Sequence, residues 1–278
     1  MKQDPPEKEN ISCKTIYVNA ADCSFRVKII HPHRLEHNAS RPNLVFLHEG
    51  LGCIELWRDF PEKLCLSTGC SGLVYDRKGY GESKPFEDTW PTDYLHKEAL
   101  IYLPALLKTV GVTDIVLIGH SDGGTIALMA ASIYNNLIRG IITEAAHIFV
   151  EDITLSGIRR AVIDFKTTVL KEKLSHYHKK NTELIFYRWA NRWLSSEFKN
   201  WNIEEYLIKI TCPVLAIQGE DDEYGTPAQI EGIANLVSGP IDVVLIPKCG
   251  HVPHFQAQKR VLGEMKQFIS KITSRMNT

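Results

Sequence analysis

Hydrophobic residues recur along the chain in two patterns, and the first is an alternation with polar residues near the N-terminus. It runs over residues 14–20 and 24–31, with Ala21-Asp22-Cys23 between the two runs. Alternation on both sides of a short turn is typical of an antiparallel β-hairpin. The polar stretch that follows, residues 32–42, is expected to form a loop.

The second pattern is a series of short apolar runs, each too brief for a helix and without alternation. Such runs suit strands that are buried on both faces of a parallel sheet. They lie at residues 44–47, 72–75, 115–118, 141–143, 214–217 and 243–246. Helix-length segments separate most of them, at residues 56–67, 92–110, 122–135, 227–237 and 256–271. Strand and helix in repeated alternation predict a doubly wound α/β sheet with its ligand crevice at the carboxyl ends of the strands.

One stretch, residues 147–206, is too long to be a simple connection. Within it, apolar residues recur at helical spacing at Ile158, Val162, Phe165 and Val169. We therefore predict a helical cap inserted over the crevice. The remaining residues, 1–146 and 207–278, are expected to form the core domain.

The composition narrows the classes of partner. The 278 residues are 44% hydrophobic and 23% charged, which excludes a disordered or fibrous chain. Lys and Arg number 32 and Asp and Glu 33, for a net charge of -1. This balance gives no reason to expect binding to nucleic acid or to an anionic membrane surface. A small-molecule partner is expected instead.

The cysteines and the N-terminal residues indicate the compartment. The seven cysteines are scattered, with no C-x-x-C pair, unlike a disulfide framework or a zinc site. The first ten residues are polar and include two prolines, and no apolar run reaches the roughly 20 residues that a membrane span needs. We therefore expect reduced thiols, no metal site and a cytoplasmic location.

The motif with the most chemical content is Gly119-His120-Ser121-Asp122-Gly123, directly after the apolar run 115–118 and directly before an expected helix. In a nucleophile elbow, a serine occupies a tight turn between a strand and a helix. Small residues on both sides avoid a clash, and the helix N-terminus favours developing negative charge. The motif in this context predicts that Ser121 is a nucleophile.

A serine nucleophile needs a base to take its proton and a carboxylate to orient that base. His251 is the candidate base, because it follows the last apolar run and opens onto the same edge of the sheet. Four consecutive carboxylates, residues 220–223, follow the preceding run, and most of them are expected to be solvated. Asp222 is favoured as the acid, with Asp221 next and Glu144, at the end of another strand, third.

With these residues in place, the sequence resembles an α/β-hydrolase-fold serine hydrolase of the esterase and lipase-like group. Ser121, Asp222 and His251 stand in the order of that family, and the resemblance covers residues 44–269. Residues 76–83, DRKGYGES, are similar to the family's D-x-R-G-x-G-x-S loop. The resemblance implies an α/β-hydrolase fold, with a mostly parallel eight-stranded sheet flanked by helices and a helical cap. Its chemistry needs no metal and no organic cofactor.

Residues 48–52, HEGLG, match the family's H-G-x-x-G loop except that Glu49 replaces the usual glycine. The resemblance implies that the backbone N–H groups of Gly50 and Asp122 form the oxyanion hole. It also implies that His48 holds the loop and is not the base. Glu49 either faces the pocket or is tied to a structural partner. We favour the second and predict that its carboxylate turns away from the oxyanion and bonds within its own loop.

Residues of the cap and of the adjoining loops are expected to decide specificity. The candidates are Glu49, Trp57, His147, Phe149, Phe186, Arg188, Trp189, Arg192 and Trp193. The cap is slightly rich in Lys, Arg and His, which hints at a substrate with an anionic end.

Together these features predict an enzyme that cleaves small carboxylic esters through an acyl-enzyme intermediate. The serine excludes dehalogenase and epoxide hydrolase chemistry, which uses an aspartate at the elbow. Two alternatives stay open: hydrolysis of a C–C bond in a ring-cleavage product by the same triad, and ligand binding without catalysis on the same fold. The expected partner is a small-molecule ester, with no nucleic acid and no membrane span, and a homodimer is compatible with the sequence.

Overall fold

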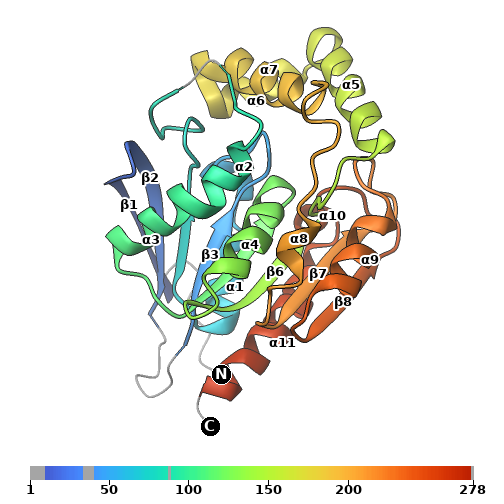
Figure 1. Ribbon diagram of the computed structural model, residues 1–278. Helices are drawn as coiled ribbons and strands as arrows, with labels where there is room; N and C mark the ends of the chain where they lie inside the picture. The colour runs from blue at the N-terminus through green and yellow to red at the C-terminus, as the bar shows by residue number, and fades with distance from the viewer. Residues whose placement is uncertain (1–9, 34–40, 87–88, 277–278) are drawn as a thin grey trace, which may run out of the picture.

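The structure is a computed structural model that describes residues 10–33, 41–86 and 89–276. Within these residues eight strands form one sheet, in the order β1-β2-β4-β3-β5-β6-β7-β8 (Figure 1). The strands are β1 (Ile11–Ala20), β2 (Cys23–Pro32), β3 (Asn43–Leu47), β4 (Gly72–Tyr75), β5 (Ile115–His120), β6 (Ile138–Glu144), β7 (Val214–Gly219) and β8 (Ile241–Ile246). The β1–β2 and β2–β4 pairs are antiparallel and the others are parallel. The predicted fold class is confirmed.

The N-terminal hairpin forms as predicted, with a tighter turn. Ala21 and Asp22 alone connect the strands, and Ala20 pairs with Cys23. Both turn residues have positive φ, +47° and +62°, as a two-residue type I′ turn requires. Residues 1–9, and residues 34–40 of the predicted loop, lie outside the described part of the chain.

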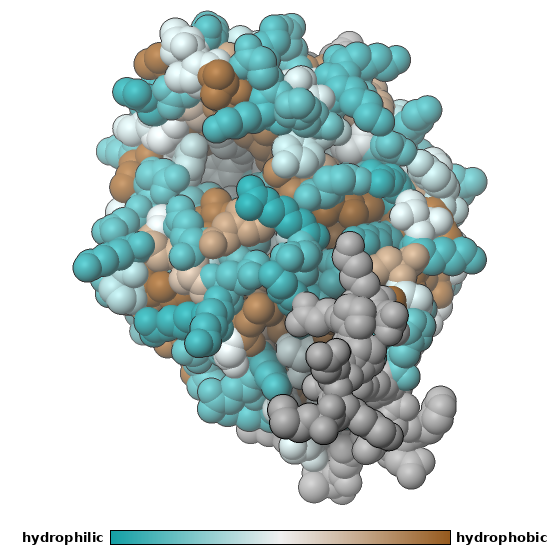
Figure 2. All heavy atoms as spheres, turned by 180° about the vertical axis from the view of Figure 1, so that it is seen from behind, coloured by the Kyte–Doolittle hydropathy of each residue, from teal (hydrophilic) through white to brown (hydrophobic). Residues whose placement is uncertain are grey.

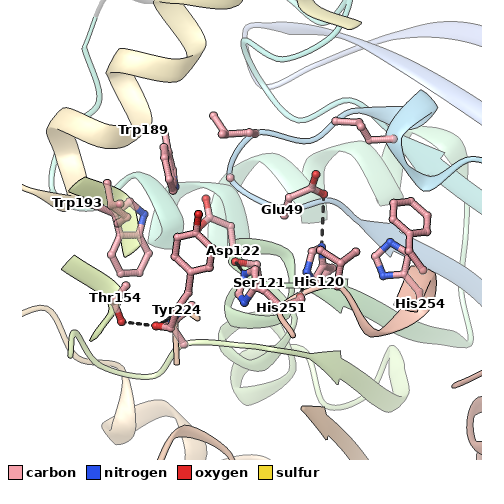
Figure 3. A pocket seen from close by; sticks show the side chains of 17 residues that line it. Glu49, His120, Ser121, Asp122, Thr154, Trp189, Trp193, Tyr224, His251 and His254 are labelled. Atoms are coloured by element: carbon pink, nitrogen blue, oxygen red, sulfur yellow. Dashed lines mark hydrogen bonds and ion pairs between the residues drawn. The ribbon is translucent and has the colours of Figure 1, made fainter. Parts of the chain in front are cut away.

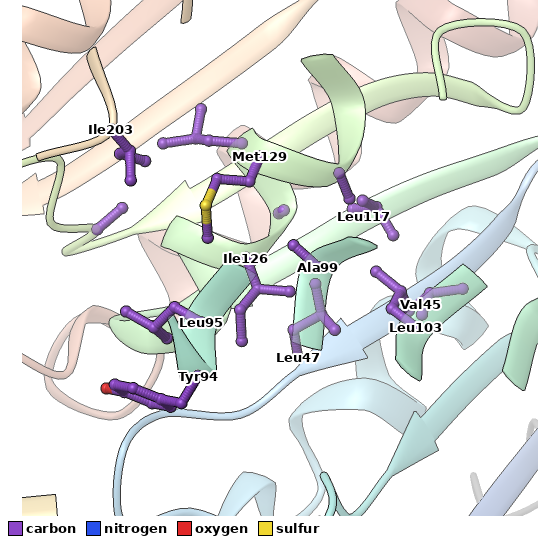
Figure 4. Packing of buried hydrophobic residues seen from close by; sticks show 14 of the residues in the cluster. Val45, Leu47, Tyr94, Leu95, Ala99, Leu103, Leu117, Ile126, Met129 and Ile203 are labelled. Carbon is purple, nitrogen blue, oxygen red and sulfur yellow. The ribbon is translucent and has the colours of Figure 1, made fainter. Parts of the chain in front are cut away.

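Helices cover both faces of the sheet, because successive side chains of each central strand point to opposite sides. In β3, Val45 and Leu47 belong to one buried cluster and Leu44 and Phe46 to the other. Figure 4 shows the first cluster, where the strands pack against α4 and the helical run α2–α3. This layer contains α2 (Tyr94–Lys97), the π-helical turn η3 (Glu98–Tyr102), α3 (Leu103–Val110), α4 (Asp122–Ile133), α8 (Glu204–Leu207) and α9 (Pro227–Leu236).

The opposite layer consists mainly of α1 (Phe60–Thr68) and α11 (Gln258–Met276), with the short helices η2 (Ile54–Trp57) and α10 (Pro253–Gln256) beside them. The expectation that every apolar run is buried on both faces is wrong for β8. This strand pairs only with β7, at the edge of the sheet, and Val243 is 45% exposed. A strand with one neighbour cannot be covered as fully as a central strand.

Residues 152–193 form a helical segment above the sheet (Figure 1). It comprises α5 (Asp152–Thr167), α6 (Leu170–His178), η4 (Lys179–Asn181) and α7 (Thr182–Trp193). The helical spacing predicted here holds for Ile158 and Phe165, which are buried. Val169 lies between α5 and α6 and is exposed, because α5 ends at Thr167.

The surface is that of an ordinary globular protein. Figure 2 shows a face on which hydrophilic residues predominate and hydrophobic residues are interspersed among them. Among the helices of the described residues, none has the length and apolar character to cross a bilayer.

Candidate active site

Ser121 occupies a strained turn between β5 and α4. Its φ is +52° and its ψ is -118°, in a region that side-chain-bearing residues rarely adopt. The two flanking glycines have no room for a side chain. A Cβ at Gly119 would lie 2.1 Å from the carbonyl oxygen of Gly123, and one at Gly123 would lie 1.9 Å from that of Leu47. The G-x-S-x-G spacing is therefore a steric requirement of this turn.

The three residues predicted as a triad lie in contact. Nε2 of His251 is 3.0 Å from Oγ of Ser121, and Nδ1 is 2.8 Å from Oδ1 of Asp222. If the serine hydroxyl donates a hydrogen bond to Nε2, the ring proton must be on Nδ1. Nδ1 then donates a hydrogen bond to the carboxylate. The side chains thus have the connectivity that general-base activation of a hydroxyl needs.

Only Asp222 of the four consecutive carboxylates is buried. Its Oδ1 also accepts a hydrogen bond from the backbone N–H of Tyr224, at 2.9 Å. Burial alone would raise the pKa of Asp222, but the hydrogen bond and the attraction of His251 lower it below its ordinary value. Glu144 bonds to a different histidine: its Oε2 accepts from the backbone N–H of His254 at 2.8 Å and lies 3.1 Å from Nδ1 of the same residue.

The two predicted oxyanion donors follow one pair of strand residues at the same sequence offset. Leu47 of β3 pairs with Gly119 of β5, and Gly50 and Asp122 each stand three residues beyond that pair. Asp122 is the first residue of α4, where a backbone N–H has no acceptor within the helix. Its carboxylate is occupied by Arg77, at 3.2 Å, and by the hydroxyl of Tyr94, at 3.1 Å.

His48 is held in place by backbone groups of its own loop, residues 48–52, and of the loop after β4. Its Nε2 accepts from the backbone N–H of Arg77 at 3.0 Å, and its Nδ1 donates to the carbonyl of Glu49 at 2.8 Å. Burial, together with the charge of Arg77, lowers the pKa of His48 well below its ordinary value. Both nitrogens are committed to backbone groups, so the ring is arranged to fix the loop.

The Glu49 carboxylate does not bond within its own loop, in contrast to the prediction. Its Oε2 lies 3.6 Å from Nδ1 of His120, and its side chain is 26% exposed to the pocket (Figure 3). Burial alone would raise the pKa of Glu49, but the contact with His120 outweighs it and lowers the pKa to about 2. Burial would lower the pKa of His120, whereas the same contact raises it above its ordinary value. The two side chains therefore lie in contact beside the nucleophile, and each favours the charged form of the other.

The pocket in front of Ser121 has a volume of about 270 Å³. Its lining includes Glu49, His147, Trp189 and Trp193 of the predicted set. The other candidates do not line it. Trp57 is buried beneath the ring of His254, 4.7 Å away, and Arg188 donates to the carbonyl of Gly79. Phe149, Phe186 and Arg192 are also absent from the lining.

Among the lining residues that the sequence analysis missed, three lie close to members of the predicted triad: His120, Tyr224 and His254. Nε2 of His120 donates to the backbone carbonyl of His251 at 2.7 Å, so the elbow supports the histidine loop. The ring of Tyr224 lies 4.8 Å from that of His251. These three residues stand within three positions of a predicted triad member, and that proximity is the signal that could have found them.

Within the described residues, one group could bring three metal ligands together: Cys53, Glu55 and Asp76. Both oxygens of Asp76 already accept backbone N–H groups, from Ile54 and Glu82. Glu55 is paired with Arg26 at 2.5 Å. Because Asp76 and Glu55 are engaged in these bonds, the group stabilises the loop after β4.

Comparison with known proteins relates the chain to several hydrolases. A sequence model described as "Alpha/beta hydrolase family" matches residues 44–264. The chain is 27% identical to proline iminopeptidase from Saccharolobus solfataricus, over 84% of this chain and 87% of that protein. It is 29% identical to serine hydrolase BPHL from Homo sapiens, over 54% of this chain and 53% of that protein.

Solved structures share the fold at lower identity. Proline iminopeptidase from Mycobacterium smegmatis superposes with a TM-score of 0.74 at 17% identity, over 95% of this chain and 100% of that one. The enol-lactonase from Burkholderia xenovorans LB400 superposes with a TM-score of 0.71 at 15% identity, over 92% of this chain and 100% of that one. At such identities the likeness concerns the fold alone.

Proposed function

The chain belongs to the α/β-hydrolase family, and on this premise we propose that it is a serine hydrolase that cleaves small carboxylic esters. The observation that carries the proposal is the unbroken hydrogen-bonded line from Ser121 through His251 to the buried carboxylate of Asp222. Nucleophile, base and acid come from three separate loops, and packing alone gives no reason for them to meet. A pocket lined mainly by apolar and aromatic residues opens directly onto the nucleophile.

The reaction proceeds in two halves. Oγ of Ser121 attacks the carbonyl carbon of the ester while Nε2 of His251 takes the hydroxyl proton. The negative charge that develops on the carbonyl oxygen is stabilised by the backbone N–H groups of Gly50 and Asp122. His251 then gives its proton to the departing alcohol, which leaves an acyl-serine. In the second half His251 takes a proton from a water molecule as the water oxygen attacks the acyl carbon. The bond to Oγ of Ser121 then breaks, His251 returns the proton to Oγ, and the carboxylic acid is released.

Asp222 contributes by its charge and its position. Its carboxylate holds Nδ1 of His251, so that Nε2 faces the serine, and it stabilises the imidazolium that exists in each transition state. The hydrogen bond and the attraction of His251 lower the pKa of Asp222 and so favour its ionised form.

The test is covalent labelling together with removal of the nucleophile. An organophosphonate should label Ser121, as mapped by peptide mass spectrometry. Ser121→Ala should lower kcat for a p-nitrophenyl ester by at least about three orders of magnitude. Ser132→Ala is the matched control, because Ser132 is buried on the same helix layer but bonds to the carbonyl of Met129. Label on another serine, or an unchanged rate in Ser121→Ala, would refute the proposal.

A second candidate function is cleavage of an amide bond. It is favoured by the relative named proline iminopeptidase, which aligns with 84% of this chain. The same triad serves amides if the leaving amine is protonated by His251. Matched p-nitrophenyl esters and p-nitroanilides of one acyl group distinguish the two. Esters are intrinsically more reactive than anilides. A kcat/KM for the anilide that equals or exceeds the kcat/KM for the ester would therefore favour the peptidase.

A further inference from the structure

The pocket has two unlike halves on either side of the nucleophile. Figure 3 shows Trp189, Trp193 and Tyr224 on one side of Ser121, and Glu49, His120 and His254 on the other. We call the second set, Glu49, His120 and His254, the polar half. The mechanism above uses none of its side chains.

Glu49 offers the polar half one open acceptor. The pKa of about 2 keeps its carboxylate ionised at neutral pH. Oε2 faces His120, and Oε1 makes no hydrogen bond to any residue that the structure describes. Both nitrogens of His120 face oxygens: Nε2 lies 2.7 Å from the carbonyl oxygen of His251, and Nδ1 lies 3.6 Å from the carboxylate of Glu49.

His254 offers a second acceptor. Its Nδ1 faces the buried carboxylate of Glu144 at 3.1 Å, to which it donates. In the neutral ring this leaves a lone pair on Nε2, and Nε2 has no hydrogen-bond partner in the described part of the chain. Two acceptors without donors call for a ligand group that carries several N–H or O–H bonds.

The charges around the pocket favour a cation over a neutral donor. Glu49 and Asp122 bring carboxylates to its lining, and the buried carboxylates of Glu144 and Asp222 contact the lining residues His254 and His251. The carboxylate of Asp122 is paired with Arg77, and that of Glu49 faces the imidazole of His120. Within the described residues, no Lys or Arg lines the pocket.

The hint from the sequence that the substrate has an anionic end is therefore not supported. Of the Lys, Arg and His residues that suggested it, the two arginines named as pocket candidates bind outside the pocket. Arg188 donates to the carbonyl of Gly79, and Arg192 to that of Trp90 and to Glu197.

We propose that the polar half binds an ammonium group of the substrate, through Oε1 of Glu49 and Nε2 of His254. The aromatic side, with Trp189 and Trp193, takes an apolar part. This deepens the proposed function and rests on it: the substrate class is an ester that bears an amine on one side of the scissile carbonyl and an apolar group on the other.

The experiment compares p-nitrophenyl esters of ω-amino acids of graded length with the same esters N-acetylated. The wild-type kcat/KM should favour the free amine by at least about tenfold at one or more lengths. Glu49→Gln should lower kcat/KM for that amine at least about tenfold and change the N-acetyl ester less than about twofold. Asp221→Asn, which removes an exposed carboxylate outside the pocket, is the control and should leave the preference intact.

The ratio of the two esters separates binding from structure. If Glu49 only supports the loops, Glu49→Gln lowers both rates equally, and the proposal is overturned. No preference for the amine in the wild type overturns it as well. If neither ester is hydrolysed in a Ser121-dependent way, the proposed function fails instead.

A measurement on the wild type covers the case in which Glu49→Gln does not fold. Hexylammonium should inhibit hydrolysis of a neutral ester competitively, at a concentration at least about tenfold lower than hexanoate does. Stronger inhibition by hexanoate contradicts the proposal.

Discussion

Replacing Asp222 by asparagine removes the negative charge of this side chain while its hydrogen bonds can be kept. Oδ1 of Asp222 accepts both from Nδ1 of His251, at 2.8 Å, and from the backbone N–H of Tyr224, at 2.9 Å. Oδ2 is buried and has no partner among the described residues. An asparagine can therefore keep its oxygen in the Oδ1 position and retain both bonds. What it loses is the negative charge beside the imidazolium.

The size of the loss follows from the separation of the two charges. An opposite charge about 4 Å away contributes about 4 kcal/mol at an effective dielectric constant of about 20. Each 1.36 kcal/mol changes a rate about tenfold, so Asp222→Asn should lower kcat by about three orders of magnitude. KM should change less than about threefold, because the substrate is bound before the imidazolium forms.

The assay is steady-state hydrolysis of a p-nitrophenyl ester by folded variants, with folding checked by circular dichroism. Asp221→Asn and Glu144→Gln are the controls. The first removes an exposed charge and the second the partner of His254. Both should lower kcat by less than about tenfold. A folded Asp222→Asn enzyme within tenfold of the wild type, or a larger loss in Glu144→Gln, would refute the assignment of the acid.

Two further predictions concern stability. The pKa of Glu49 is lower in the folded chain, about 2 against an ordinary 4.5, so its contribution is complete above about pH 4.5 and is lost as the pH falls toward 2. Glu49→Gln should lower the free energy of unfolding by an amount on the order of 2 kcal/mol at pH 7 and by much less near pH 2. Urea unfolding at both pH values measures this, and an equal difference at both would contradict it. Gly123→Ala should prevent stable folding, because its Cβ would lie 1.9 Å from the carbonyl of Leu47. Gly263→Ala, with nothing within 4 Å, should melt at or above the wild-type temperature; similar melting of the two variants would show that the turn can relax.

The sequence was sufficient for the fold because its central strands are buried on both faces. Continuous apolar runs such as residues 115–118 can be read without knowing their neighbours. The edge strand β8 shows the limit of this reading. Its run is as apolar as the others, and its exposure depends on its place in the sheet, which the local pattern does not contain.

The candidate triad could be predicted because each member follows closely after a strand. The partners of Glu49 and Glu144 could not be predicted, since each carboxylate contacts a histidine from a distant part of the chain. Arg188 shows the same difficulty in reverse. Its position in α7, next to Trp189, suggests a pocket residue, but a rotation of about 100° between successive helical residues turns it to the carbonyl of Gly79.

The pairing of Leu47 with Gly119 also determines where the chain tolerates changes in length. The two N–H groups proposed for the oxyanion hole stand three residues beyond this pair. We expect one residue inserted or deleted between the pair and either group to shift that group relative to the other. We therefore expect the lengths of these two loops to tolerate no change without loss of activity. The segment 152–193 contributes side chains to the pocket but no member of the triad, so insertions and deletions there alter the shape of the chamber and leave the spacing of the reacting groups untouched.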